Sequence, residues 1–284
     1  MRELLIIAAV PLLVGGAVFE APAKPRAVEA IATDYAFQLP RELPPGPTTF
    51  HFQNNGKVYH EIAIIMLKPG ATIDQVVEAA KVQTLSSASV TDALVGILFA
   101  GPGKRSTSGL STELLPGRQY AVWCNFRDTT TAPRHFEMGM YSLINVRAGS
   151  ANRSSANVKA DTIVATDYSF RYPRTLSPGR HTLVFRNDGK VRHEVNIILP
   201  KKGVTFEQMF AVRLAGGNPR VLNDEQLGVL FAPPGSAPLG RLDVNLLPGR
   251  EYRIICVFMD DPKAPRHFQL GMYGSIRVPS KPGS

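Results

Sequence analysis

The sequence predicts an all-β protein that consists of two tandem antiparallel β-sandwiches, each carrying a short helical insertion. Glycine and proline number 24 and 23 among 284 residues, and such frequent turn residues favour short strands over long helices. Apolar and polar residues alternate at a period of two in several segments, as expected of half-buried strands. The chain also repeats itself once, and its length is about that of two typical domains. Each half is therefore expected to bury its own core.

Four pairs of matching segments define the repeat. ATDYAFQLPRELPPG and ATDYSFRYPRTLSPG begin at Ala32 and Ala165. The later pairs are NNGKVYHEIAII with NDGKVRHEVNII, LLPGRQYAVWC with LLPGREYRIIC, and TAPRHFEMGMY with KAPRHFQLGMY. The small polar stretch between the halves has no periodicity, which is typical of a linker. We therefore expect a first domain at residues 24–148, a linker at 149–156 and a second domain at 157–284.

The period-two strands of each unit place one histidine and one cysteine on an inward face. Phe50 and Phe52 alternate with polar neighbours in an earlier strand. An interruption in each unit is expected to be helical, because Thr72–Gln75 and Thr205–Gln208 have the pattern of capping boxes. The inward residues of the remaining strands are Val58, His60 and Ile62, Tyr120, Val122 and Cys124, Val191, His193 and Val195, and Tyr252, Ile254 and Cys256.

Residues 1–23 have the pattern of a secretory signal peptide. A short charged start precedes the uncharged run Leu4–Val18, and Ala21–Ala23 supplies an A-x-A cleavage site. The run is short for a bilayer span of roughly 20 residues and contains Pro11. We expect the protein to be periplasmic or extracellular. The alternative is an uncleaved N-terminal anchor that associates with the membrane.

Charge and cysteine content exclude several classes of function. Lysine and arginine total 32 against 23 acidic residues, and this net charge of +9 favours an anionic partner. The basic residues are scattered without a stripe or a binding motif, so nucleic acid is not an expected partner. Two cysteines are too few for a disulfide-stapled fold or a cysteine-rich metal cluster. A bond between them is not expected, because they occupy equivalent deep positions in separate domains.

The repeat selects a set of candidate metal ligands. Four of the six histidines recur at equivalent positions, whereas His51 and His181 do not. Both cysteines and two methionines recur as well, so each unit offers an inward histidine followed by a Cys-x10-His-x4-Met segment. The candidates are His60, Cys124, His135 and Met140 in the first unit and His193, Cys256, His267 and Met272 in the second.

This set of donors suits copper. Imidazole and thiolate bind copper in both oxidation states, and a trigonal His2Cys site with a long axial methionine changes little when it gains or loses an electron. Small reorganisation makes electron transfer fast. Three of the four ligands lie on one loop between the last two strands, so the ion is expected at one end of each sandwich.

The NxGxxxHE segment, the LLPGRxY turn before the cysteine strand and the HxxxGM ending resemble the cupredoxins, the plastocyanin and azurin type of blue copper protein. The resemblance runs from about Val28 to Val146 and from about Asn157 to Val278. It implies one type 1 copper site per domain, up to two in the chain, with an axial thioether from Met140 and Met272. Met138 is a rival axial ligand, but it aligns with Leu270. The ten-residue gap from cysteine to histidine and the helical insertion depart from small one-domain cupredoxins.

The resemblance leaves three functions open. The first is an exported two-domain carrier of single electrons, whose partner would be a redox protein such as a cytochrome or a membrane redox complex. The second is a metal-free cupredoxin-like scaffold that serves as a periplasm-facing subunit of a membrane respiratory or photosynthetic complex. The third, copper carriage or storage, uses the same ligands.

Tandem cupredoxin domains also form multicopper oxidases and copper nitrite reductases. Those enzymes resemble this chain but hold additional copper at the domain interface with several more histidines, often in His-x-His pairs. This sequence has no His-x-His pair, and after two sites are filled only His51 and His181 remain. We therefore expect that the protein is not an enzyme.

Two further pairs of residues have competing interpretations. Arg134 and Arg266 directly precede the loop histidines, where they form either a basic rim that steers an acidic partner or an ordinary charged loop. Tyr120 and Tyr252 lie four residues before the cysteines. They are expected to make a structural hydrogen bond at the corner of the LPGRxY turn.

Overall fold

The structure is a computed structural model that describes residues 24–82, 89–129, 131–150, 159–236 and 239–280. The elements of the first domain are β1 (Arg26–Thr33), β2 (Ala36–Gln38), β3 (Glu42–Leu43), β4 (Gly46–Asn54), β5 (His60–Leu67), α1 (Ile73–Val82), β6 (Thr91–Ala100), β7 (Gly109–Leu114), β8 (Gln119–Trp123), the 3-10 helix η1 (His135–Met138) and β9 (Tyr141–Val146).

Among the described residues, the second domain repeats this order without a strand that corresponds to β3 and with one additional short helix, η2. Its elements are β10 (Asp161–Thr166), β11 (Ser169–Arg171), β12 (Gly179–Asn187), β13 (His193–Pro200), α2 (Phe206–Leu214), η2 (Pro219–Leu222), β14 (Asn223–Ala232), β15 (Gly240–Leu246), β16 (Glu251–Ile255), η3 (His267–Leu270) and β17 (Tyr273–Arg277). The predicted signal peptide or anchor, and most of the predicted linker, lie outside the described residues. No helix in the described ranges has the length and apolar character needed to cross a membrane.

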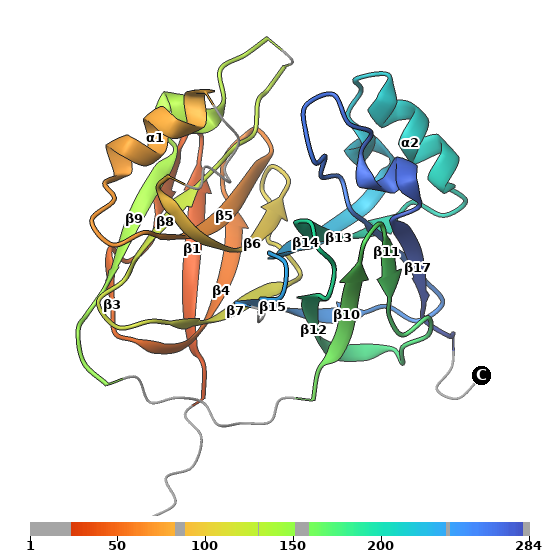
Figure 1. Ribbon diagram of the computed structural model, residues 1–284, viewed down its shortest axis with the longest axis horizontal. Coiled ribbons are helices and arrows are strands. Elements are labelled where there is room, and N and C mark those ends of the chain that lie inside the picture. The colour runs from red at the N-terminus through yellow and green to blue at the C-terminus, as the bar shows by residue number, and fades with distance from the viewer. Residues whose placement is uncertain (1–23, 83–88, 130, 151–158, 237–238, 281–284) are drawn as a thin grey trace, which may run out of the picture.

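The all-β fold with one helical insertion per half is confirmed. Both helices begin with the expected capping box: Thr72 N–H donates to Gln75 Oε1 at 3.0 Å, and Gln75 N–H donates to Thr72 Oγ1 at 3.3 Å. Thr205 and Gln208 make the same pair of bonds at the start of α2. Figure 1 shows the red-to-yellow first domain beside the green-to-blue second domain, with α1 and α2 on the same side.

Two sheets run through both domains, which the prediction of two separate sandwiches did not include. One sheet has the order β11-β10-β12-β15-β7-β4-β1-β2, and the other has the order β17-β16-β13-β14-β6-β5-β8-β9-β3. The last six residues of β6 are buried, and so is most of β14, so both strands need a neighbour on each side. Pairing β6 with β14 and β7 with β15 supplies those neighbours.

The sheets are also not purely antiparallel. β1 pairs with β4, β10 with β12, and β3 with β9 in parallel. β3 belongs to the sheet opposite β1 and β4, so the chain crosses to the other sheet and returns between these two strands. Such a crossover is what allows a parallel pair.

The two domains are related by a pseudo-twofold axis through the joined strands. Leu110 pairs with Leu242 and Ile97 with Val229, and in both pairs the partners occupy matching places in the sequence repeat. An interface that joins the same positions of both copies is isologous, as in a symmetric dimer. His60 pairs with Ala100 at the end of β6, and His193 pairs with Ala232 at the end of β14. Because β6 and β14 are antiparallel, these two ends lie at opposite ends of the shared sheet.

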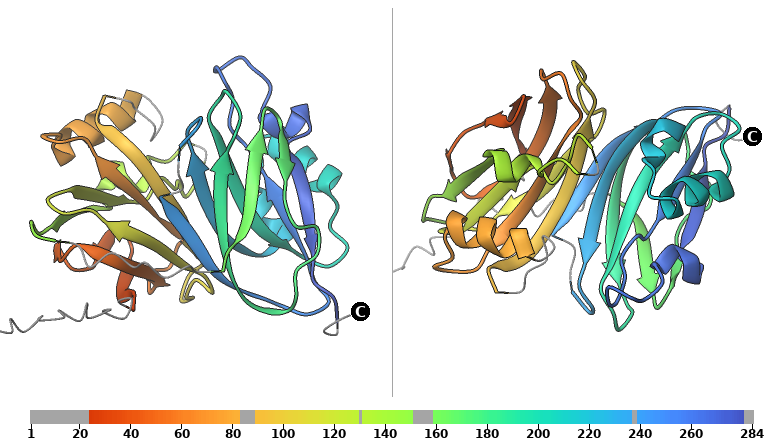
Figure 2. Two further views of the ribbon diagram at one scale, coloured as in Figure 1. Left: turned by 60° about the horizontal axis from the view of Figure 1, so that its bottom comes forward. Right: turned by 90° about the horizontal axis from the view of Figure 1, so that it is seen from above.

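Each domain has three layers. The main core lies between the two sheets and includes Phe50, Phe52 and Leu110, all fully buried. Helix α1 covers the outer face of the larger sheet, where Val76 packs in one cluster with Trp123. Helix α2 covers the same face of the second domain (Figure 2). The apolar core fills the space between the two sheets. The candidate ligands therefore lie at the ends of the sandwiches, next to His60 and His193.

We predict that Gly240→Ala weakens the joint between the domains. Residue 240 is on β15 of the second domain, and Val95 is on β6 of the first. A Cβ atom at residue 240 would lie 2.1 Å from the carbonyl oxygen of Val95. Overpacking of this kind costs about 1–3 kcal/mol, and each kcal/mol lowers Tm by about 2–4 °C in a domain of roughly 200 residues. Calorimetry measures the shift. Gly101→Ala is the control, because its Cβ would meet only ordinary contacts at 3.6 Å. Equal Tm values for the two variants would contradict the interface.

Candidate metal centres

An asparagine at the end of the preceding strand positions the first histidine of each site. Asn54 Nδ2 donates to the carbonyl oxygens of Val58 at 2.8 Å and Ala100 at 3.0 Å, so the loop before β5 is fixed against β6. A Cβ on Gly56 would lie 2.3 Å from an Asp34 carboxylate oxygen, which explains the glycine of the NxG motif. The same bonds form in the second domain, from Asn187 to Val191 and Ala232.

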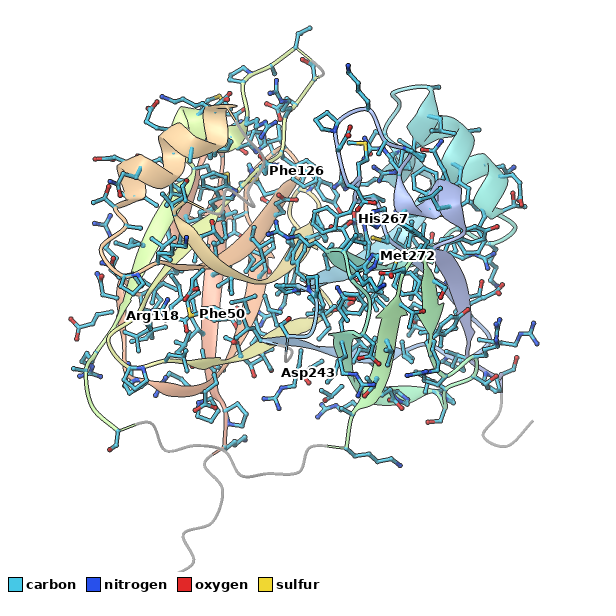
Figure 3. All side chains as sticks on the ribbon, in the orientation of Figure 1. Phe50, Arg118, Phe126, Asp243, His267 and Met272 are labelled. Atoms are coloured by element: carbon cyan, nitrogen blue, oxygen red, sulfur yellow. The ribbon has the colours of Figure 1, made fainter. Side chains whose placement is uncertain are left out.

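The other three candidates lie on one tightly bonded loop. Cys124 N–H donates to Met140 O at 3.1 Å, and Met140 N–H donates to His135 O at 3.0 Å. Phe136 N–H donates to Cys124 O at 3.0 Å, so the backbone of the loop closes on itself around the cysteine. The corresponding bonds of Cys256, His267, Phe268 and Met272 in the second domain are 3.0–3.1 Å long. Figure 3 labels His267 and Met272 in this loop.

The structure brings two imidazoles and one sulfur together in each domain. The groups are His60, Cys124 and His135, and His193, Cys256 and His267. In the first, the two Nδ1 atoms are 3.0 Å apart, and Cys124 Sγ lies 3.4 Å from His135 Nδ1 and 3.8 Å from His60 Nδ1. The second triangle has sides of 3.1, 3.4 and 3.9 Å. A point about 2 Å from all three atoms exists in each, close to metal–nitrogen and metal–sulfur bond lengths.

The predicted axial methionines are buried in the same loops as the other ligands. Met140 and Met272 are fully buried, and both belong to the same core cluster as Cys124 and Cys256. Met138, the rival in the first domain, is 38% exposed, and its counterpart Leu270 is 44% exposed. Burial and the backbone bonds to the loop ligands thus favour Met140 and Met272 over Met138 and Leu270, and their role as axial ligands stays a prediction.

The ligand side chains are held in a dry environment. All six histidine and cysteine residues of the two groups are fully buried. Burial, with the neighbouring His135 imidazole, lowers the pKa of His60 to about 4, and His193 is lowered to about 4 by burial and His267. Burial and the Glu194 carboxylate raise the pKa of the Cys256 thiol to about 12. Burial and the Glu61 carboxylate raise the pKa of the Cys124 thiol in the same way. At neutral pH the first histidines are therefore unprotonated ligands, while each thiol keeps its proton until a metal displaces it.

A carboxylate and a tyrosine orient the loop histidine of each site, and the sequence analysis missed both. His135 Nε2 is 3.0 Å from Asp128 Oδ1, and Tyr35 Oη donates to Asp128 Oδ2 at 2.6 Å. A proton held on Nε2 leaves the Nδ1 lone pair for the centre of the triangle. The Tyr35 hydroxyl and His135 lower the pKa of the Asp128 carboxyl, which keeps it ionised.

The second domain repeats this outer shell with Asp260 and Tyr168. His267 Nε2 is 3.0 Å from Asp260 Oδ1, and Tyr168 Oη donates to Asp260 Oδ2 at 2.6 Å. Tyr35 and Tyr168 both have a positive φ, 65° and 61°, which is rare outside glycine and common at functional positions. The repeated ATDY tetrapeptide, which ends on these two tyrosines, is the feature of the sequence that could have indicated their role.

The arginines beside the loop histidines are part of the loop structure. Arg134 Nη1 donates to Asn125 Oδ1 at 3.0 Å, and Arg266 Nη1 donates to Val257 O at 2.9 Å. Because both guanidinium groups are hydrogen-bonded near the loop histidines, the structure favours an ordinary charged loop over a basic rim that steers an acidic partner. The corner bond predicted for the tyrosines is present, because Leu115 N–H donates to Tyr120 Oη at 3.0 Å and Leu247 N–H donates to Tyr252 Oη at 2.9 Å.

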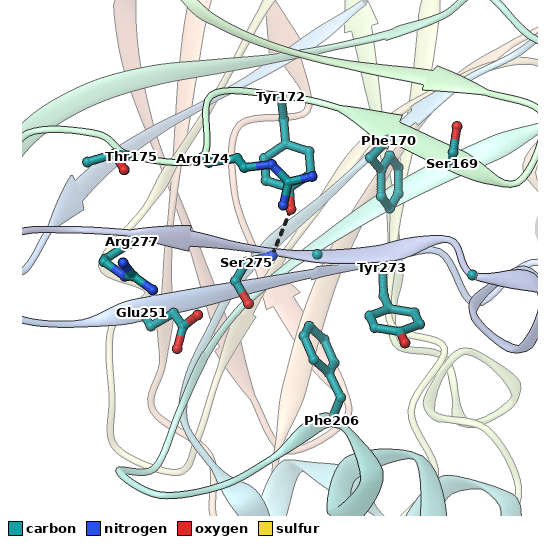
Figure 4. Close-up of a pocket in the computed structure, with 12 residues that line it drawn as sticks. Ser169, Phe170, Tyr172, Arg174, Thr175, Phe206, Glu251, Tyr273, Ser275 and Arg277 are labelled. Carbon is teal, nitrogen blue, oxygen red and sulfur yellow. Dashed lines mark hydrogen bonds between the residues drawn. The ribbon is translucent and has the colours of Figure 1, made fainter.

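The two histidines outside the repeat lie away from both groups. His51 is on β4, near Gly109, and His181 is on β12, where Nδ1 contacts Asp161 Oδ2 at 2.6 Å. A separate cavity of about 630 Å³ opens at the edge of the second domain, between Tyr172, Phe206, Tyr273 and Arg277 (Figure 4). Its lining contains none of the candidate ligands.

Comparison with known proteins gives similarity to copper proteins at low identity. No protein-family model and no curated protein sequence matches the chain. The reduced auracyanin of the photosynthetic bacterium Roseiflexus castenholzii is 19% identical over 44% of this chain and 98% of its own, with a TM-score of 0.31.

Other solved structures are similar to both halves of the chain at once. Copper nitrite reductase from Nitrosomonas europaea is 16% identical over 90% of this chain and 93% of its own, with a TM-score of 0.25. A blue copper oxidase from the same organism is 13% identical over 90% and 86% of the two chains, with a TM-score of 0.26.

The prediction that the protein is not an enzyme is wrong on this comparison. Solved structures that cover 90% of this chain include multicopper oxidases and a copper nitrite reductase, which are enzymes. The prediction counted the histidines available for a copper cluster between domains. That count concerns a single kind of catalytic site, so it did not justify excluding enzymes as a class.

We predict that copper binding to the cupredoxin-like sites releases about one proton per site at pH 7.5. Each thiol is protonated at this pH and must lose its proton to bind, whereas His60 and His193 are already neutral. Affinity should therefore rise about tenfold per pH unit between pH 6 and 9. Calorimetry in buffers of different ionisation enthalpy counts the protons. Proton release that persists in a Cys124→Ser, Cys256→Ser double variant would contradict this assignment.

We also predict that Asp128→Asn weakens copper binding in the first domain about 10- to 100-fold, because an amide orients the His135 ring less strongly than a carboxylate. Competition with a chelator measures the affinity of each site. Asp260→Asn should do the same to the second site alone. Asp188→Asn is the matched control, since this exposed carboxylate pairs with Arg186. Unchanged affinity in Asp128→Asn would show that the outer shell has no role.

Proposed function

We propose that this protein is a type 1 copper protein that carries single electrons between redox partners outside the cytoplasm. The observation that supports it is the buried His–Cys–His triangle with an adjacent buried methionine, present in both domains. A bound copper ion would supply reversible one-electron chemistry at each site. The proposed partner is a redox protein such as a cytochrome or a membrane redox complex.

The way the ligands are held supports electron transfer over simple metal storage. His60 is fixed through Asn54, His135 through Asp128, and Cys124 through the backbone bonds of its own loop. A donor set that is preorganised by its surroundings moves little when the charge of the ion changes. Small movement is required for fast electron transfer, whereas a storage site gains nothing from it.

The placement of the sites supports two separate docking surfaces. The pseudo-twofold arrangement puts His60 and His193 beside opposite ends of the joined strands β6 and β14. Each site has its own Tyr–Asp pair. A partner would therefore approach each copper ion at a separate surface.

The proposal of export depends on the sequence. The A-x-A segment after the apolar N-terminal run supports a secreted or periplasmic location. The oxidising environment there is not expected to join the two cysteines in a disulfide bond, because each is buried in its own domain.

We predict that the copper-loaded protein holds two copper ions per chain and has an intense thiolate-to-copper absorption band in the visible range. Cys124→Ser and Cys256→Ser should each remove one ion and about half of the band, and the double variant should have no band. Metal analysis and visible spectra measure both quantities. Met138→Leu is a control that leaves the spectrum unchanged, because its side chain is exposed.

Two results would contradict the proposal. A wild-type protein that binds copper without the band would indicate another kind of copper site. A double cysteine variant that keeps its cellular function in full would favour the metal-free scaffold.

A further inference from the structure

Arg220 is a partly buried cation that the second domain places against the first. It lies in η2, directly before β14, and its guanidinium carbon is 4.0 Å from the ring centroid of Phe126. The rings of Phe99 and Tyr59 lie 5.4 and 5.5 Å away. All three rings belong to the first domain, and Phe126 (labelled in Figure 3) follows Cys124 by two residues. Cation–π contacts of this kind are strongest where water is excluded.

The second domain holds the other side of the same guanidinium. Arg220 Nε donates to Gln226 Oε1 at 2.9 Å, and Gln226 Nε2 donates to Asn196 Oδ1 at 3.0 Å. Both partners lie on strands of the second domain. Arg220 therefore has a fixed position relative to both domains.

Phe126 connects Arg220 to the loop ligands of the first metal site. The carbonyl oxygen of Phe126 accepts the His135 N–H at 2.8 Å, and the Phe126 and His135 rings lie 6.4 Å apart. Cys124 lies two residues before Phe126. A line of contacts thus leads from the second domain to the ligands of the first site.

The second site has a different set of charges. The segment before β6, residues 83–90, contains no arginine in the sequence. Glu194, the residue after the ligand His193, has Arg213 and Arg266 of its own domain and Glu61 of the first domain among the charges that act on it. The charges that act on Cys256 are the carboxylates of Glu194 and Asp260.

We propose that Arg220 is an interdomain positioning residue that raises the reduction potential of the first copper site. The inference depends on the proposed function, since it assigns a property to the copper that His60, Cys124 and His135 would hold. A fixed positive charge favours the state of lower positive charge, which is the reduced one. Two sites with the same ligands are thereby made unequal by the joining of the domains.

The test measures the potential of each site separately. A Cys256→Ser background leaves only the first site, and a Cys124→Ser background leaves only the second. Arg220→Met removes the charge at similar length, and Arg186→Met removes an exposed arginine that pairs with Asp188. Redox titration against a dye of known potential, followed by visible absorption, gives the reduction equilibrium constant.

We expect Arg220→Met to lower that constant about tenfold at the first site, the effect of one unit charge at about 12 Å in an effective dielectric of about 20. Arg186→Met should change it less than twofold. Neither variant should change the second site. In copper-free protein, a double-mutant cycle of Arg220→Met with Phe126→Leu should show coupling in thermal unfolding.

The outcomes separate this inference from the proposed function. If the copper band forms and Arg220→Met leaves the first site unchanged, the inference is wrong and the proposed function stands. Equal shifts at both sites, or no coupling with Phe126 in copper-free protein, would also overturn the inference. If the wild-type protein forms no such band, the proposed function fails, and the inference fails with it.

Discussion

Each site depends on three buried donor atoms that are held close together. The two Nδ1 atoms face each other at 3.0–3.1 Å, with the sulfur at 3.4–3.9 Å, in a place that water does not reach. Such proximity needs outside support, because buried polar atoms are costly unless they are satisfied. Asp128 and Asp260 contact the Nε2 atoms of the loop histidines. Asn54 and Asn187 fix the backbone next to the strand histidines, whose buried Nε2 atoms have no hydrogen-bond partner within the described part of the chain.

The pseudo-twofold joint explains how two similar sites can coexist in one molecule. Pairing β6 with β14 and β7 with β15 removes the edge strands that each half would otherwise expose. Glycine at residue 240 lets the backbones approach, with a Cβ position only 2.1 Å from Val95 O. The joint is not fully symmetric, since Arg220 crosses it in one direction only. Duplication thus provides the two sites, and the interface makes them different.

Much of the site could be predicted from the sequence, because its residues recur in order within each repeat. The inward positions of His60 and Cys124 followed from the period-two pattern of their strands, and the choice of Met140 over Met138 followed from alignment with Met272. The Tyr–Asp shell could not be predicted in this way, because Tyr35 and Asp128 are 93 residues apart and meet only in the folded chain.

The shared sheets were missed for a different reason. The apolar runs VGILFA in β6 and LGVLFA in β14 lack alternation, which indicates strands buried on both faces and with neighbours on both sides. That signal was present, but a run of this length does not identify its partner strand. The exclusion of enzymes rested on counting histidines, and it failed because one kind of active site was taken for all of them.

X-ray absorption at the copper edge of the loaded wild-type protein tests the central claim most directly. The account predicts two nitrogen atoms at about 2 Å and one sulfur at about 2.2 Å from each ion, the shell that the donor triangles would form. A shell of oxygen and nitrogen without sulfur would contradict it, because the copper would then lie outside the two buried triangles.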